Sequence, residues 1–177
     1  MHTPQTIVIF GTGDLSRGIA NGLSGGGDRV LLCDEAFEGV TRLAEGLRAA
    51  YPSYDVEAVH CSYDAVWESD VIVLAVPPEA HREIAKRIRP VANLKVVINT
   101  QAASEELCRS LDNCRMVQAF DSVDPAAFYL PLSERVKIDC PVRGKNSEAV
   151  RTAVELVESI GFRAVIASEG SAVPQQI

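Results

Sequence analysis

Residues 11–16, Gly-Thr-Gly-Asp-Leu-Ser, form the segment whose residue types and spacing best suit chemistry. They fit the pattern G-x-G-x-x-small, with a serine where a third glycine or an alanine usually stands. The first glycine permits a tight turn, the second lets the backbone approach a pyrophosphate, and a small sixth residue lets a helix pack near a strand. Free amides and the positive end of the helix dipole would then bind the phosphates. Because glycine turns are common, the pattern needs support from its context. The residues predicted to bind a dinucleotide here are Gly11, Thr12, Gly13, Asp14, Leu15 and Ser16.

An acidic residue farther along the chain gives that support. Asp34 follows a predicted strand at 29–33 and stands 21 residues after Gly13. This is close to the spacing of about 20 residues at which an acid binds the adenine ribose. Asp34 and Glu35 would repel the 2′-phosphate of NADP(H), and no arginine is adjacent in the sequence, so NAD(H) is predicted over NADP(H). Two alternatives remain: Asp34 caps the following helix, a role compatible with ribose binding, and Asp14 only complements a helix dipole.

The loop after the most apolar predicted strand, 71–76, is a second candidate. In open α/β sheets ligands lie beyond the carboxyl ends of the strands, at the point where the strand order reverses. The loop residues predicted to border the cofactor are therefore Ala75, Val76 and Pro77. The alternative is that the proline pair at 77–78 only ends the strand. His81, in the next helix, is the histidine best placed for chemistry, although a histidine on a helix surface usually has no catalytic role.

The sequence indicates no other type of catalytic centre. It has no Gly-x-Ser-x-Gly elbow, no His/Glu cluster at metal-ligand spacing, and no lysine in the glycine turn. No metal site is predicted, and no catalytic residue is assigned.

Strands and helices are predicted to alternate through the first 120 residues. Strands are expected at 6–10, 29–33, 56–61, 71–76, 94–99 and 115–120, with helices at about 14–23, 37–51, 63–69, 79–88 and 104–111 between them. This alternation predicts a doubly wound α/β sheet of Rossmann type, mainly parallel, with helices on both faces. Beyond it we expect a short helix at 124–128, a strand from 136 towards 142, a helix at 146–160 and a strand at 163–167.

Length and composition limit the remaining possibilities. A chain of 177 residues, 47% apolar and 23% charged, is predicted to form a single domain over 1–177, with an irregular tail at 168–177. No apolar stretch approaches the roughly 20 residues of a bilayer span, so membrane insertion is not expected. The N-terminus has no basic region of the kind that precedes a secretory signal, which favours the cytoplasm. A formal charge of −7 disfavours nucleic acid as a partner.

The cysteines are expected to be reduced and mostly buried. There are five of them, an odd number, with no C-x-x-C pair and no histidine at a metal-ligand spacing. They are Cys33, Cys61, Cys108, Cys114 and Cys140.

Several segments together resemble one known family. These are the glycine turn at 11–16 and the segments 70–77, 95–98, 117–120 and 141–144. Over about Thr6 to Ser168 the chain resembles the NADP oxidoreductases that depend on the deazaflavin coenzyme F420, a family that includes archaeal reductases and the cytoplasmic domain of six-transmembrane metalloreductases. The resemblance implies that a nicotinamide and a second substrate lie near Ala119, Phe120 and Asp121.

The chain also departs from this family. It reads Gln-Ala-Phe-Asp at 118–121 where Lys-Ala-Phe-Asn is common, and Asn-Thr-Gln-Ala-Ala at 99–103 where Asp-x-(Ser/Thr)-Asn-Pro is common. It has Asp34 and Glu35 where typical members hold the 2′-phosphate with a small polar residue and an arginine. The sequence ends soon after Ile166, where longer relatives continue into helices, so a homodimer or a partner subunit is expected to complete the site.

Three functions follow as expectations. The first is an oxidoreductase that moves a hydride between NAD(H), or less readily NADP(H), and a flavin-like, deazaflavin or small organic acceptor. The second is a non-catalytic dinucleotide sensor that regulates a partner. The third is one part of an enzyme similar to pyrroline-carboxylate reductase or prephenate dehydrogenase that lacks its helical dimer domain.

Overall fold

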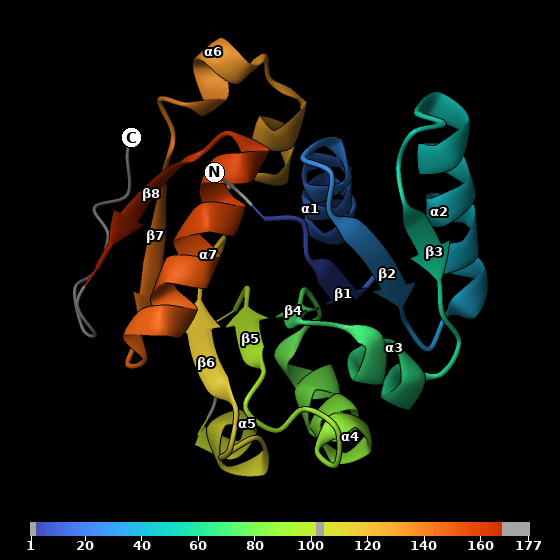
Figure 1. Cartoon of the computed structure of the whole chain (residues 1–177), viewed down its shortest axis with the longest axis vertical. Coiled ribbons are helices and arrows are strands. Elements are labelled where there is room, and N and C mark those ends of the chain that lie inside the picture. Colours follow the sequence, from blue (N-terminus) through green and yellow to red (C-terminus); the bar gives the residue numbers. More distant parts are fainter. Residues whose placement is uncertain (1–2, 102–104, 168–177) are drawn as a thin grey trace.

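Parallel strand pairs form most of the sheet in the computed structural model, which describes residues 3–101 and 105–167. The strand order is β3-β2-β1-β4-β5-β6-β7-β8 (Figure 1). The strands are β1 (Thr6–Phe10), β2 (Arg29–Cys33), β3 (Val56–Ala58), β4 (Val71–Leu74), β5 (Val96–Asn99), β6 (Arg115–Gln118), β7 (Asp139–Gly144) and β8 (Arg163–Ile166). Strands β1 to β6 are all parallel and follow the order 3-2-1-4-5-6. The predicted doubly wound, mainly parallel α/β fold is thus confirmed.

Helices cover both faces of this sheet, and each face has its own apolar core (Figure 1). One face carries α1 (Asp14–Gly25), α2 (Phe37–Ala50) and α7 (Ser147–Ile160). The other carries α3 (Ser62–Glu68), α4 (Pro78–Ile88) and α5 (Glu105–Ser110). Every residue of β4 and β5 is buried. This burial on two faces explains why those strands read as continuous apolar runs without alternation.

The chain changes direction after β6. The 3-10 helix η1 (Pro125–Tyr129) and α6 (Leu132–Arg135) lead into β7, which is antiparallel to β6, and β8 is parallel to β7. The predicted strand start at 136 was wrong, because backbone hydrogen bonds of turn type continue to Ile138, whose amide donates to Arg135. The predicted irregular tail at 168–177 lies outside the described residues, and the single-domain assignment stays a prediction.

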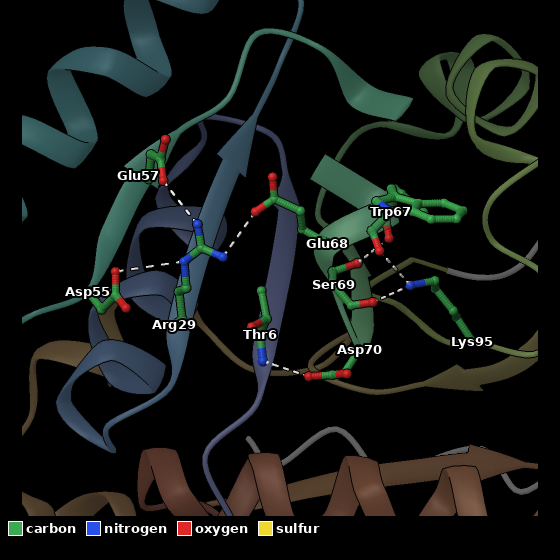
Figure 2. A network of polar contacts seen from close by, with 10 residues as sticks. Thr6, Arg29, Asp55, Glu57, Trp67, Glu68, Ser69, Asp70 and Lys95 are labelled. Carbon is green, nitrogen blue, oxygen red and sulfur yellow. Dashed lines mark hydrogen bonds and ion pairs between the residues drawn. The ribbon is translucent and has the colours of Figure 1, made fainter. Parts of the chain in front are cut away.

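Polar contacts join the elements at the amino ends of the strands (Figure 2). Arg29, which begins β2, donates to Glu68 at 3.0 Å and to Glu57 at 3.2 Å. The amide of Thr6, which begins β1, donates to Asp70 at 2.9 Å. Exposed ion pairs of this kind each contribute little to stability. Ligands of such sheets bind at the carboxyl ends of the strands. These polar contacts lie at the opposite edge, so they are not part of a ligand site.

Within the described ranges, no helix is long and apolar enough to cross a membrane.

Candidate dinucleotide-binding site

Gly11 occupies a position that other residues would fill only under strain. Its φ of +117° is rarely adopted by residues with a side chain. A Cβ there would lie 2.3 Å from the carbonyl oxygen of Ala75 and 2.7 Å from Oγ of Ser16. Conformation and space therefore both require glycine, as expected where β1 turns sharply into α1.

Ser16 connects this turn to the loop after β4. Its side chain is fully buried, and its hydroxyl donates to the carbonyl of Ala75 at 3.1 Å. A larger side chain would have to displace that loop. The small sixth residue of the sequence pattern thus sets how closely α1 approaches β4.

The first turn of α1 is open to solvent. Gly13 is the residue before the helix, no side chain among the described residues caps it, and both Gly13 and Asp14 are exposed. A Cβ on Gly13 would meet no described atom within 4 Å. Thr12 packs against α2 instead, since a Cβ on Gly39 would lie 3.1 Å from its methyl group, and Leu15 packs against the core. An uncapped, exposed helix start of this kind can bind an anion.

A cavity of about 610 Å³ lies at the carboxyl ends of β1, β2 and β4. The ends of β1 and β2, the loop after β4 and one face of α4 supply its apolar lining of Phe10, Cys33, Val76, Pro77, Ala80 and Ile84. Asp34 also lines it, so the structure brings together three predicted site residues from two separate loops. Its volume falls in the usual range of about 300 to 1,000 Å³ for small-molecule sites.

Asp34 closes the turn that leads into α2. Its Oδ1 accepts a hydrogen bond from the amide of Ala36 at 2.8 Å. Ala36 is itself the residue before the helix, so Asp34 is not the N-cap residue that the alternative interpretation proposed. This contact fixes the carboxylate at the rim of the cavity.

Arg87 is the residue of this site that sequence reasoning missed. Its Nη2 donates to Oε1 of Glu35 at 2.8 Å, across 52 residues of sequence. No arginine is adjacent to Asp34 and Glu35 in the sequence, but the fold brings Arg87 next to Glu35. A signal existed, because Arg87 follows Ala80 and Ile84 at the spacing that places residues on one helix face.

Acidic groups dominate the rim of the cavity. Asp34, Glu35, Glu79 and Glu83 line it together with the single guanidinium of Arg87. At the end of β2, burial raises the pKa of the Cys33 thiol to about 11, and the carboxylate of Asp34 adds to the rise. This thiol therefore stays protonated at neutral pH.

His81 lies inside the protein rather than on a helix surface. It is 2% exposed and shares the sheet-facing side of α4 with Ala85 and Ile88. Burial lowers the pKa of His81, and the carboxylate of Glu79 opposes that effect. The interpretation of His81 as a surface histidine was wrong, since its phase in the helix matches the buried positions.

The predicted acceptor residues lie at the end of β6. Ala119 and Phe120 are buried, and Phe120 has a left-handed backbone with φ of 64°. Such a conformation is unusual for a bulky residue and needs support from its surroundings. The side chain of Asp121 is 21% exposed, and its Oδ2 accepts from Gln118 Nε2 at 2.8 Å and from Arg143 Nη1 at 3.1 Å. Of the three predicted residues, Asp121 alone presents a charged side chain.

The register of the strands places a polar row beside Asp121. Asn99 pairs with Gln118, which pairs with Arg143 of β7. Residues paired in this way point to the same face of a sheet. Asn99 is fully buried, and its Nδ2 has no hydrogen-bond partner among the described residues. Sequence analysis included Arg143 only within the segment 141–144 that carried the family resemblance and gave it no role, because nothing in the sequence pairs β7 with β6.

The structure records all five cysteines as free. Cys33 and Cys140 are buried and Cys114 is half-buried, but Cys61 and Cys108 are exposed. The expectation of mostly buried thiols was therefore wrong for two of them. In the part of the chain that the structure describes, no three His, Cys, Asp or Glu side chains gather as metal ligands.

Comparison with known proteins identifies the family. The sequence profile described as NADP oxidoreductase, coenzyme F420-dependent, matches residues 6–103. The chain belongs to this family. It is 28% identical over 182 aligned residues to the F420-dependent NADP reductase of Methanothermobacter thermautotrophicus, an alignment that covers 89% of this chain and 78% of that protein. The family resemblance drawn from the sequence motifs is thus confirmed.

Solved structures share the fold. A putative F420-dependent NADP reductase from Arthrobacter sp. FB24 superposes with a TM-score of 0.73 and 13% identity, covering 93% of this chain and 85% of that one. A pyrroline-5-carboxylate reductase from Coxiella burnetii gives a TM-score of 0.70 and 17% identity, covering 94% and 60%. The prediction of an NAD(P)-dependent oxidoreductase is confirmed for the family, while the acceptor and the preference for NAD(H) stay predictions.

Proposed function

We propose that the chain transfers a hydride between a bound nicotinamide dinucleotide and an organic acceptor. The observation that supports this most is the cavity of about 610 Å³, which Asp34, Val76 and Pro77 line together with Phe10, the last residue of β1 before the glycine turn; residues 11–16 are not among its lining residues. It lies where the strand order reverses between β1 and β4, and dinucleotides bind across this crevice in sheets of this order.

The predicted residues have separate tasks in this proposal. The amides that follow Gly13 hold the pyrophosphate, Gly11 keeps the turn tight, and Asp34 accepts hydrogen bonds from the adenine ribose. Thr12, Asp14, Leu15 and Ser16 complete the turn. The residues that border the dinucleotide on the other side are Ala75, Val76 and Pro77.

Catalysis depends mainly on positioning. When bound, the nicotinamide supplies or accepts the hydride, so the chain needs no acid–base residue for that step. The chain binds two ring systems and orients them, which converts an encounter of two molecules into a step within one complex. The apolar loop at 75–77 keeps water from the reacting rings.

We place the acceptor at the ends of β5 and β6, near Ala119, Phe120 and Asp121. A flavin, a deazaflavin or a small carbonyl compound offers oxygen atoms to the guanidinium of Arg143, the charged donor beside Asp121. The relative from Methanothermobacter thermautotrophicus is named for coenzyme F420, which supports a deazaflavin. A second copy of the chain or a partner subunit would cover this side, with the cytoplasm as the compartment.

We propose NAD(H) as the preferred dinucleotide. Four carboxylates and one guanidinium at the cavity rim give a formal excess of negative charge. A 2′-phosphate brought among them meets repulsion that NAD(H) avoids.

Titration of the purified protein with NADH and with NADPH, followed calorimetrically, tests binding. Turnover is then measured as the loss of NADH absorbance when oxidised FMN, an oxidised deazaflavin or a small oxo compound is added as the acceptor. Absence of heat with either dinucleotide contradicts the proposal, and Asp34→Asn is expected to weaken NADH binding about tenfold.

A dinucleotide sensor is the second candidate. Gln118 and Asp121 support it, because they stand where members of the family commonly have a lysine and an asparagine. Tight binding of NADH without oxidation by any acceptor would favour the sensor over the enzyme.

A further inference from the structure

We infer that Glu35 and Arg87 together determine which dinucleotide the site accepts. Arg87 is the residue able to bind a 2′-phosphate, and Glu35 occupies that arginine. The inference rests on the proposed function, since it concerns the choice between NAD(H) and NADP(H) in the same cavity.

The geometry places the pair where a ribose phosphate would lie. Glu35 directly follows Asp34, the residue proposed to bind the ribose hydroxyls, and both line the cavity. Arg87 reaches this rim from α4, with Nη2 2.8 Å from Oε1 of Glu35. The guanidinium thus lies beside the predicted 2′-position, although it comes from the far side of the cavity.

The two anions compete for the same donors. A guanidinium binds carboxylate and phosphate through the same planar fork of N–H groups. While Glu35 holds Arg87, the arginine is partly neutralised and a 2′-phosphate must displace a carboxylate.

The ion pair between Glu35 and Arg87 is exposed enough for another anion to replace the carboxylate. The side chains of Glu35 and Arg87 are 70% and 49% exposed, and ion pairs as exposed as this are weak. Removal of Glu35 should therefore free Arg87 without harm to the fold, so that a change in affinity reports on recognition rather than unfolding.

The experiment is a double-mutant cycle. Dissociation constants for NADH and NADPH are measured for the wild type, Glu35→Gln, Arg87→Gln and the double variant. In Glu35→Gln, NADPH affinity should rise about tenfold while NADH affinity changes less than about twofold. When Arg87 is already glutamine, Glu35→Gln should raise NADPH affinity about threefold or less, through reduced repulsion alone.

Glu38→Gln is the matched control. Glu38 is 92% exposed on α2, pairs with Arg42 at 3.6 Å, and does not line the cavity. This variant changes net charge by the same amount as Glu35→Gln, so the ratio of NADPH to NADH affinity should stay at the wild-type value.

The outcomes separate the inference from the proposed function. Failure of the wild type to bind either dinucleotide defeats both. If NADH binds and Glu35→Gln improves NADPH binding equally with and without Arg87, Glu35 acts by repulsion and the inference is wrong. Tighter binding of NADPH than NADH by the wild type also overturns it.

Discussion

The hydroxyl of Ser16 donates a hydrogen bond to the carbonyl of Ala75 at 3.1 Å, across 59 residues of sequence. The bond joins α1 to the loop after β4, on the two sides of the point where the strand order reverses. Gly11 lies between them, because a Cβ there would collide with both partners. The turn proposed for the pyrophosphate and the loop proposed for the cofactor are therefore one packed unit.

Substitutions of Ser16 should separate the hydrogen bond from the packing. Ser16→Ala loses one buried hydrogen bond and should lower the free energy of unfolding by about 1 kcal/mol. Ser16→Val adds bulk at a fully buried position and should lower it by about 2 to 3 kcal/mol. Urea unfolding measures both, and a valine variant as stable as the alanine variant would show that the loop yields easily.

Gly11 and Gly13 should respond differently to the same change. Gly11→Ala forces a side chain into a left-handed backbone and against a backbone oxygen, so stability should fall by about 3 kcal/mol. Gly13→Ala meets no described atom and should cost about 1 kcal/mol or less. The Cβ of the new alanine would point into the open space at the start of α1, where the pyrophosphate is proposed to bind. Gly13→Ala should therefore still weaken NADH binding about tenfold.

Thermal unfolding and calorimetric titration measure the two effects. Unchanged NADH affinity in a folded Gly13→Ala or Gly13→Val protein would contradict the assignment of the pyrophosphate to this turn.

The sequence predicted the part of the site that depends on strand ends. Parallel strands bring their carboxyl ends to one edge, so Asp34, Val76 and Pro77 could be placed at one cavity without coordinates, whereas the glycine turn is not among the lining residues of that cavity and its role stays a prediction. The same logic predicted the doubly wound sheet. Both inferences use only the order of the elements and the residues that follow each strand.

Side-chain contacts between distant elements could not be predicted in this way. The spacing of Arg87 from Ala80 and Ile84 indicates the helix face on which it lies, but not that its guanidinium reaches Glu35 across 52 residues of sequence. The burial of His81 was open to prediction, since His81, Ala85 and Ile88 share one helix face. The antiparallel direction of β7 could not be predicted, because it depends on the path of the connection between β6 and β7, which contains η1 and α6.

Exposure and pKa predict the order in which the cysteines react. Cys61 and Cys108 are exposed and should be modified by a thiol reagent in the folded protein. Cys33 and Cys140 should react only on unfolding, because burial raises the pKa of these thiols to about 11 and about 12. Mass spectrometry of partly modified protein identifies the sites, and early modification of Cys33 would contradict its burial.

The raised thiol pKa values also predict a loss of stability at high pH. Below the ordinary thiol pKa of 9.0 the folded and unfolded thiols are both protonated, so these groups add no pH dependence. Above it the unfolded thiols ionise while Cys33 remains protonated up to about 11, so the free energy of unfolding should fall between these values. Urea unfolding as a function of pH measures the fall, which Cys33→Ala should reduce.

The ion pair between Arg143 and Asp121, at the carboxyl end of β6, should stabilise the protein more than the ion pair at the start of that strand. Its side chains are only 14% and 21% exposed, and Asp121 also accepts a hydrogen bond from Gln118. Arg143→Gln should lower the free energy of unfolding by about 1 to 3 kcal/mol, because it leaves a poorly solvated carboxylate with one donor fewer.

Arg115→Gln provides the comparison. Arg115 begins β6 and pairs with Glu148 at 2.8 Å, with side chains 33% and 59% exposed, so its loss should cost about 1 kcal/mol or less. If the acceptor lies beside Asp121, Arg143→Gln should also lower the turnover of any active acceptor while the affinity for NADH stays at the wild-type value. Equal losses of stability in the two variants would mean that the side chains around Asp121 are as well solvated as those at the surface. A loss of NADH affinity in Arg143→Gln would mean that the dinucleotide, rather than the acceptor, binds at this end of the sheet.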